Sequence, residues 1–163
     1  MIVDSEAVRS TMRYWATGVT IVTAKHHDHY HGMTVSSFTS ISLEPPLVLV
    51  SLEKTTRTHE LVQKAGVFGV TILAEEQIEI SNRFANPHTE TGYRFGDIVT
   101  HTLETGVPFI SDGLAFLDCR VVSSLSEGTH TMFVGEVVAL GTGKIRNPLL
   151  YYNRGYRLLS ESS

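Results

Sequence analysis

The chain alternates between short apolar runs typical of strands and a few stretches with helical spacing. The first helical stretch begins after Asp4 or Ser5, either of which can cap a helix, and Gly18 lies where a helix commonly ends. One face of this stretch carries three apolar side chains: Val8, Met12 and Trp15. We therefore predict an amphipathic N-terminal helix whose apolar face covers the core.

From residue 19 the hydrophobic pattern becomes that of β-structure. Segments 19–25 and 33–42 are rich in β-formers and are separated by the polar turn 26–32, which predicts a hairpin. A pair of prolines then precedes the continuous apolar run 47–52. Because this run has no polar alternation, we predict a strand that is buried on both faces.

Two helices interrupt the strands. Segment 58–66 has helical spacing and ends at a glycine, and segment 74–85 opens with two acids that suit the positive end of a helix dipole. Between them lies a predicted strand at 67–73, and 86–97 is typical of a loop. The remainder is mostly strand and turn, with predicted strands at 98–103, 114–122, 129–140 and 156–159.

The predicted fold class is mainly β, with a few covering helices. About six to eight strands with few long helices favour an antiparallel barrel, which removes exposed strand edges by closing on itself. A length of 163 residues with 42% hydrophobic content suffices for one core, so we expect a single domain over residues 1–163.

Charge and cysteine content exclude several classes of function. The net charge of -4 argues against a nucleic-acid-binding face, which needs clustered cations. No apolar run approaches the ~20 residues of a membrane span, and the acidic start lacks the features of a signal peptide. Cys119 is the single cysteine, so no internal disulfide forms and a cytoplasmic location is expected.

Common catalytic signatures are missing from the sequence. It contains neither a G-x-G-x-x-G nor a G-x-x-x-x-G-K-[ST] motif, no nucleophile elbow and no evident carboxylate pair. Hydride transfer is compatible with so few catalytic side chains. In such a reaction a cofactor carries the chemistry, and the protein only holds donor and acceptor in position.

Two segments are candidates for holding such a cofactor. Segment 33–40 carries five hydroxyl side chains on a strand and its exit, a surface suited to a polar heterocycle or phosphate. It also fits a Ser/Thr-rich strand with one solvated face. Segment 51–58 leaves a strand and enters a helix, where free N–H groups, Lys54, Arg57 and threonine hydroxyls can bind an anion. A plain helix cap with solvated basic neighbours is the alternative there.

One arginine and the histidines complete the candidates. Arg83 lies near the end of the predicted helix 74–85, where it either favours the helix dipole or serves as a second phosphate anchor. Four histidines crowd one turn without the ligand spacing of a known structural metal site, so no metal is predicted: His26, His27, His29 and His31. His130 differs, because it lies in a turn that can present its imidazole to a ligand.

The chain resembles the short flavin reductases of two-component flavin-dependent monooxygenases, the flavin reductase-like family with an FMN-binding split barrel. The resemblance runs from about Met12 to Leu159 and is carried by HGMTVSSFTSISLEPPLVLVSL, NRFA, GTHTMFVGEV and PLLYYNRGYRLL, with a similar opening in YWATGVTIVTA. It implies an antiparallel split β-barrel that transfers hydride from NADH or NADPH to FMN or FAD. It also implies a homodimer that passes reduced flavin to a separate monooxygenase.

The resemblance assigns roles to residues at matching positions. It implies flavin contacts from Met33, Thr34, Val35, Ser36, Ser37, Ser51, Leu52, Lys54, Thr55, Thr56, Arg57, Arg83 and Phe84. The family's hairpin commonly reads Gly-Asp-His with its histidine near flavin and nicotinamide, so His130 is the implied catalytic residue. Thr129 replaces the aspartate of that motif and removes a carboxylate from this region.

Two other functions remain open on the sequence alone. One is a flavin-binding module without reductase activity, or a flavoprotein whose electrons go to a protein partner. The other is a β-barrel carrier for an apolar ligand, since closed barrels often enclose small molecules.

Overall fold

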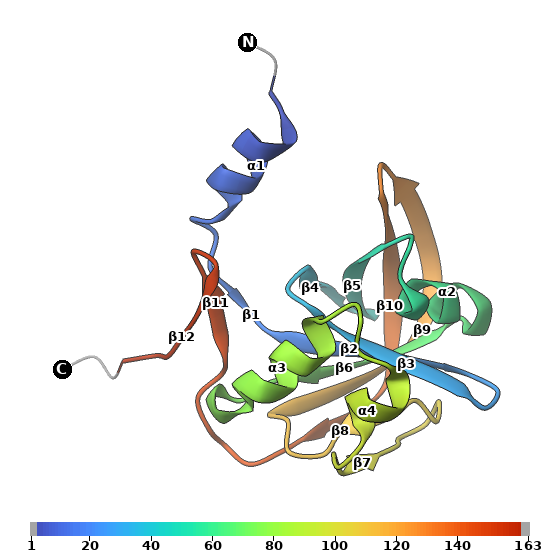
Figure 1. Cartoon of the computed structure of the whole chain (residues 1–163). Coiled ribbons are helices and arrows are strands. Elements are labelled where there is room, and N and C mark those ends of the chain that lie inside the picture. The colour runs from blue at the N-terminus through green and yellow to red at the C-terminus, as the bar shows by residue number, and fades with distance from the viewer. Residues whose placement is uncertain (1–2, 161–163) are drawn as a thin grey trace.

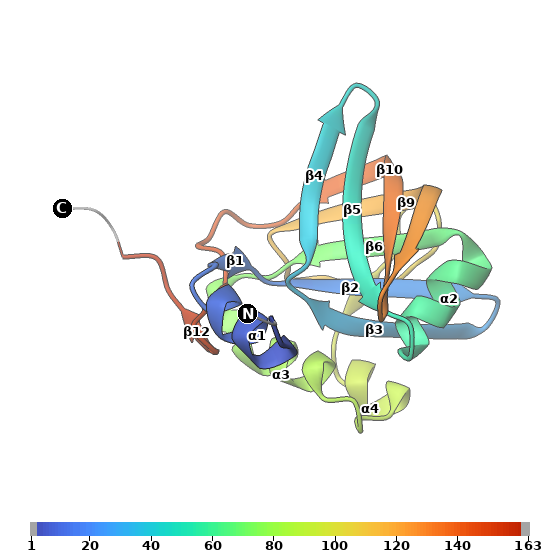
Figure 2. The same cartoon turned by 90° about the horizontal axis from the view of Figure 1, so that it is seen from above.

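A seven-stranded antiparallel sheet forms the body of the molecule. The computed structural model describes residues 3–160. The spatial order of the strands is β3-β2-β6-β9-β10-β5-β4, and every neighbouring pair is antiparallel. Their bounds are β2 Thr20–His26, β3 His29–Val35, β4 Phe38–Leu43, β5 Pro46–Glu53, β6 Val67–Ile72, β9 Ala115–Glu127 and β10 His130–Thr142. The sheet curls so that β2 and β3 run across β4 and β5, which confirms the split β-barrel (Figure 2).

Smaller elements surround this sheet. The helices are α1 Ser5–Met12, α2 Arg57–Ala65, the 3-10 turn η1 Glu75–Gln77, α3 Ile78–Ala85 and α4 Thr91–Phe95. Two small sheets complete the fold: β1 Thr17–Gly18 with β11 Leu150–Tyr152 and β12 Gly155–Arg157, and β7 Thr100–His101 with β8 Phe109–Ile110. Helices α3 and α4 lie together in front of the sheet (Figure 1). Within residues 3–160 no helix has the length and apolar character needed to cross a membrane.

The core lies on both sides of β2. Every residue from Thr20 to Ala24 is buried, because side chains on one face enter the sheet's interior and those on the other face meet the layer of α3 and α4. Inside the sheet, Phe68 and Val50 pack against Leu61 and Val62 of α2. Outside it, Phe84 and Phe95 contact edge to face with ring centroids 5.0 Å apart. Helix α2 thus closes the interior, while α3 and α4 cover the outer face.

Several sequence predictions are confirmed in their local detail. Asp4 caps α1 by accepting a hydrogen bond from the Ala7 N–H at 2.8 Å. Gly66 ends α2 in the left-handed conformation with φ of 68°, a backbone that glycine adopts without a steric penalty. The first predicted hairpin is present as β2 and β3, although segment 33–42 divides into two strands at residues 36–37.

Other predictions are wrong, for identifiable reasons. Helix α1 ends at Met12, buries no residue and stands away from the sheet (Figure 1), so it does not cover the core. Strand β5 buries alternate residues only, because β4 and β5 extend beyond the body (Figure 2) and one face stays partly exposed. Segment 86–97, expected to be a loop, contains α4, whose aromatic residue Phe95 packs into the core.

Candidate functional site

A cleft of about 890 Å³ lies where four elements meet. Strand β3 and its exit, the turn from β5 into α2, the end of α3 and the β11–β12 hairpin each contribute a wall. Ligand pockets commonly measure about 300–1,000 Å³, so this cleft is large enough for a substantial organic ligand. It contains seven of the residues implied by sequence: Met33, Thr34, Ser36, Thr55, Thr56, Arg57 and Phe84.

The β3 wall is held against α3 by a side-chain contact. Thr34 Oγ1 donates a hydrogen bond to the Ser81 carbonyl at 2.6 Å, which joins the strand to the helix beneath the cleft. Ser36 lies just beyond the end of β3 and is exposed. The break between β3 and β4 therefore leaves residue 36 facing both this cleft and the neighbouring groove, where a planar polar ring can lie along the backbone.

The turn from β5 into α2 has the features of an anion site. Thr56 caps α2, accepting from the His59 N–H at 3.3 Å while its own hydroxyl donates to the Glu53 carbonyl at 2.8 Å. Thr55 and Arg57 line the cleft beside this cap. Arg57 is exposed and has no ion-pair partner among residues 3–160. Its guanidinium, together with the positive end of α2, suits a phosphate.

Four residues implied by sequence lie beside the cleft rather than in it. Ser37 Oγ donates to the Ser51 carbonyl at 2.7 Å, and both serines line a neighbouring groove of about 510 Å³ that also includes Trp15. The side chains of Val35 and Leu52 are buried in the core, so they shape their strands without facing a ligand.

Two basic residues implied by sequence point elsewhere. Lys54 Nζ donates to the Gly128 carbonyl at 2.8 Å and lines a small depression with His59 and Thr131. Arg83 binds Asp97 at 2.6 Å and does not line the cleft. The hydrogen bond from this guanidinium lowers the pKa of the Asp97 carboxyl. In this structure Arg83 is therefore part of an ion pair.

His130 begins β10 at the edge of the site. It is exposed, its Nδ1 lies 2.9 Å from Thr129 Oγ1, and its backbone partner across the sheet is Glu53. Glu53 lines the cleft and His130 does not, so the imidazole stands at the outer rim of that wall. The register of β10 on β5 accounts for this position, because it brings the 128–130 turn next to the turn that leads into α2.

Sequence reasoning missed His31 as a residue of the cleft. His27 and His29 of the same turn are exposed, but His31 is buried, and its Nδ1 lies 2.8 Å from Thr58 Oγ1 of α2. Burial, with smaller contributions from the charges of Arg94 and Arg57, lowers the pKa of His31 to about 4. The alternation of side chains along β3 could have predicted this position, because His31 lies on the same strand face as Met33, which also lines the cleft.

Arg94 is the second residue that sequence reasoning missed. Its guanidinium is buried and donates to four backbone carbonyls at 2.7 to 3.1 Å. The accepting carbonyls belong to Gly32, Phe84, Asn86 and Thr89. Arg94 thereby fixes the end of α3 and the following segment against β3. Nothing in the sequence around it distinguishes such a buried cation from a solvated one.

The β11–β12 hairpin forms the remaining wall. Tyr151, Arg154, Gly155 and Tyr156 line the cleft, and the Tyr156 hydroxyl lies 2.8 Å from Ser81 Oγ and 2.9 Å from Asn82 Oδ1. Among the lining residues within 3–160, Glu53 is the one carboxylate. The cleft thus combines hydroxyls, aromatic rings and arginines without a carboxylate pair, a composition that suits binding a polar cofactor and not acid–base hydrolysis.

The comparisons with known proteins agree with this geometry. The model of the family described as "Flavin reductase like domain" matches residues 12–160. The reductase component of a 4-nitrophenol 4-monooxygenase/4-nitrocatechol 2-monooxygenase from Rhodococcus opacus is 42% identical over 151 residues, covering 91% of this chain and 78% of that protein. The NADH-dependent flavin reductase StyB of Pseudomonas fluorescens is 37% identical over 157 residues, covering 94% and 89%.

A solved structure extends the likeness to three dimensions. The NADH:FAD oxidoreductase SgcE6 of Streptomyces globisporus, in complex with NAD and FAD fragments, superposes with a TM-score of 0.90 at 30% identity. The match covers 100% of this chain and 99% of that one.

Proposed function

The chain belongs to the flavin reductase-like family, and we propose that it is an NADH- or NADPH-dependent flavin reductase that supplies reduced FMN or FAD to a separate monooxygenase. The observation that carries this assignment is the cleft that joins the exit of β3 to the N-terminus of α2. One end of the cleft offers a phosphate site, and the other offers a strand edge and hydroxyls for a ring.

The residues present fit a flavin. Arg57, the Thr55 hydroxyl and the first N–H groups of α2, which Thr56 caps, would hold the phosphate. Thr34 and Ser36 lie along the wall that receives the ring, with Met33 providing apolar contact. A bound flavin supplies the acceptor for the hydride that the reduced nicotinamide delivers, which is chemistry that no side chain of the cleft provides.

The protein's own part in the reaction is to bind and orient the two ligands. The backbone N–H groups at the exit of β3 would hold the flavin ring by hydrogen bonds and would favour negative charge on it. The hydrogen bonds from Arg94 to the Gly32 and Phe84 carbonyls hold α3 against β3. These two elements form facing walls of the cleft, so Arg94 helps to set the geometry in which the two ligands would meet. His130, at the rim, would contact the nicotinamide.

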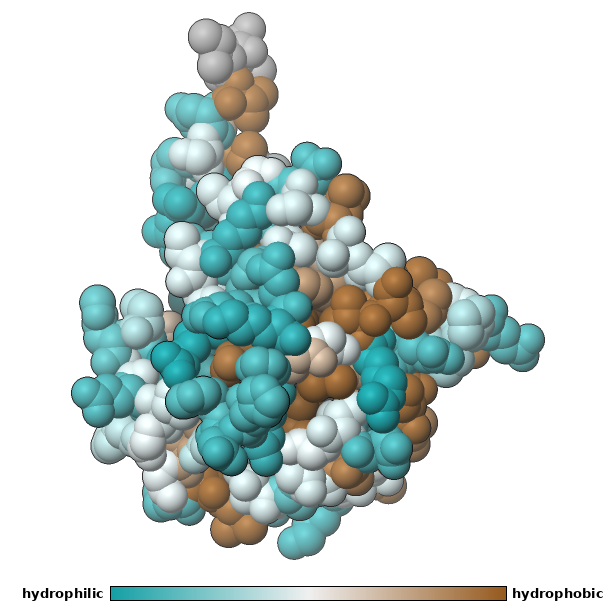
Figure 3. Space-filling model, turned by 90° about the vertical axis from the view of Figure 1, so that its right-hand side faces the viewer, coloured by the Kyte–Doolittle hydropathy of each residue, from teal (hydrophilic) through white to brown (hydrophobic). Residues whose placement is uncertain are grey.

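We also propose that the protein is a homodimer. Helix α1 exposes Val8 and Met12, the linker after it exposes Trp15, and the edge strand β4 exposes Ile41 and Leu43. Figure 3 shows hydrophobic residues between the body and the projecting β4–β5 turn, and others on the projecting N-terminal segment. A second copy that covers these surfaces would bury apolar side chains and protect the free edge of the sheet.

We also propose a cytoplasmic location, where a lone buried thiol such as Cys119 stays reduced.

The test of the reductase activity is oxidation of NADH and of NADPH by purified protein, measured with and without FMN, FAD and riboflavin. Turnover that depends on flavin and saturates with it is expected. A protein that binds flavin tightly and stoichiometrically, yet oxidises neither nicotinamide, would contradict the reductase assignment.

A further inference from the structure

Arg154 stands in the β11–β12 turn, on a different wall of the cleft from the phosphate site at α2. Asn153 and Arg154 are the two central residues of this turn, which joins the paired residues Tyr152 and Gly155. Both have positive φ, 49° and 60°. In such two-residue turns Asn is favoured at the first position and Gly at the second, because most side chains are crowded in the left-handed conformation.

An arginine therefore occupies the position where glycine would fold more easily. A side chain kept in an unfavourable backbone conformation at the wall of a binding cleft points to a use for that side chain. Gly155 follows directly, but it is paired with Tyr152 in the strand and is not one of the two residues with positive φ. It therefore does not remove the steric crowding at Arg154. The identity of residue 154 is thus explained by ligand binding better than by folding.

The turn itself is anchored on three sides. The Asn153 N–H donates to the Arg13 carbonyl at 3.1 Å, and Tyr151 pairs with Thr17 of β1. Tyr156 reaches α3 through Ser81. These contacts hold the backbone of residue 154 beside the cleft, so the guanidinium is presented from a fixed point.

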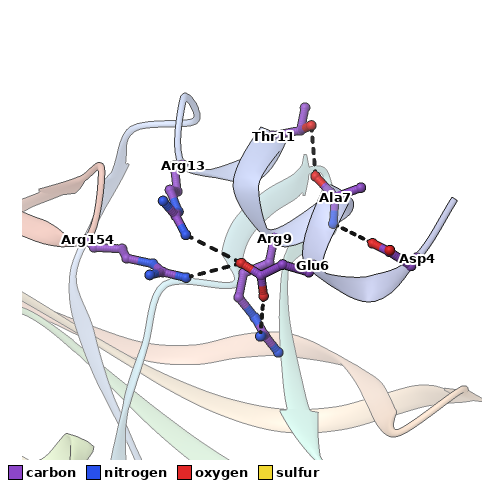
Figure 4. A network of polar contacts seen from close by, with 7 residues as sticks. All are labelled: Asp4, Glu6, Ala7, Arg9, Thr11, Arg13 and Arg154. Atoms are coloured by element: carbon purple, nitrogen blue, oxygen red, sulfur yellow. Dashed lines mark hydrogen bonds and ion pairs between the residues drawn. The ribbon is translucent and has the colours of Figure 1, made fainter.

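The charge around Arg154 is strongly positive for a chain whose net charge is -4. Figure 4 shows Glu6 of α1 surrounded by three guanidinium groups. Arg9 contacts Glu6 at 3.0 Å, Arg13 at 3.5 Å and Arg154 at 3.7 Å. One carboxylate thus faces three cations, and Arg154 makes the longest of the three contacts. An anion in the cleft can compete for this guanidinium, because exposed ion pairs of this kind are weak.

We propose that Arg154 binds the pyrophosphate of a dinucleotide: the pyrophosphate of NADH, or in FAD the phosphate next to the one that the α2 site holds. This inference rests on the proposed function, which requires the cleft to receive a flavin and a nicotinamide dinucleotide. The cleft volume of about 890 Å³ lies within the range for ligand pockets. FAD and NADH both carry a pyrophosphate, whereas FMN carries one phosphate only.

The test compares Arg154→Gly with the unchanged protein. Glycine removes the guanidinium and suits the backbone at this position, so the thermal midpoint of unfolding should stay the same or rise. We expect the Kd of FMN to be unchanged. The Kd of FAD, the KM of NADH, or both should rise about tenfold, as expected for loss of a charge-assisted contact to phosphate.

Two comparisons identify the ligand and control for charge. Reduced nicotinamide mononucleotide lacks the pyrophosphate, so its KM should be equal in both proteins if NADH is the ligand that Arg154 binds. Arg9→Ala removes another cation from Glu6 without altering the lining of the cleft, and it should leave all these constants unchanged.

Two results would overturn the inference while the proposed function stands. One is a variant whose Kd values for FMN and FAD and whose KM for NADH equal those of the active parent protein. The other is an equal loss of affinity for all three, which would indicate a general effect of charge. A parent protein that binds neither flavin nor NADH would instead overturn the proposed function, and this inference with it.

Discussion

His31 Nδ1 lies 2.8 Å from Thr58 Oγ1, a contact that joins β3 to the first turn of α2 beside the cleft. A second histidine makes a similar contact, since His59 Nε2 lies 2.8 Å from Thr131 Oγ1 of β10. Burial lowers the pKa of both histidines, with added repulsion from nearby cations. The start of α2 is therefore held by two neutral imidazoles, and the phosphate site depends on its position.

Acid should destabilise the fold through His31. Its pKa is about 4 in the folded protein and near 6.5 in an unfolded chain, so the unfolded state binds more protons between these values. The stabilisation is complete above pH 6.5 and is lost as the pH falls to about 4, with a total on the order of 3 kcal/mol. Urea unfolding of His31→Asn across this range should show a smaller pH dependence. His29→Asn, at an exposed site on the same strand, should keep the parent profile.

Arg57→Ala should weaken flavin binding without affecting the fold. Loss of a charge-assisted hydrogen bond to phosphate costs about 1–3 kcal/mol of affinity, and Arg57 has no ion pair within residues 3–160 to lose. Fluorescence titration with FMN measures the change. Lys64→Ala removes an exposed cation from the far end of the same helix and is the matched control. Equal affinity in all three proteins would remove Arg57 from the site.

His130→Ala should slow hydride transfer or weaken nicotinamide binding while flavin affinity changes little. The imidazole lies at the rim beside Glu53 and does not line the cleft that receives the flavin. Stopped-flow reduction of bound flavin by NADH separates the two effects. Kinetics identical to those of the parent would make His130 an ordinary residue at the end of a strand.

Trp15→Glu should shift the protein from dimer to monomer. Trp15 is 68% exposed and lies in the linker between α1 and β1, so a charge there costs little in the single chain. Light scattering after gel filtration gives the mass. Tyr93→Glu, which places the same charge at another exposed aromatic residue on α4, serves as the control. A parent protein that is already monomeric would contradict the dimer proposal.

The sequence predicted best what is decided locally. The cap at Asp4, the stop at Gly66 and the strand-to-helix turn at Arg57 depend on a few neighbouring residues, and each lies where expected. The resemblance added the split barrel and seven of the residues that line the cleft. The role of Arg83 was not predictable in this way, because Asp97, its partner in the structure, comes 14 positions later.

Long-range packing decided the rest. The periodicity of Val8 and Met12 predicted an apolar helix face but could not show what that face meets, and within one chain α1 meets no core. His31 and Arg94 are polar residues whose burial depends on elements distant in sequence. A one-dimensional pattern distinguishes neither of them from a solvated residue.

Arg94 has a consequence for how the site responds to ionic strength. Salt screens exposed charges strongly and buried ones much less. The wall that Arg94 holds through Gly32 and Phe84 is fastened inside the protein, whereas Arg57 meets its ligand in contact with solvent. Rising salt should therefore weaken the affinity for the flavin phosphate without changing the shape of the cleft. A flavin that dissociates then leaves a cleft that can bind the next flavin.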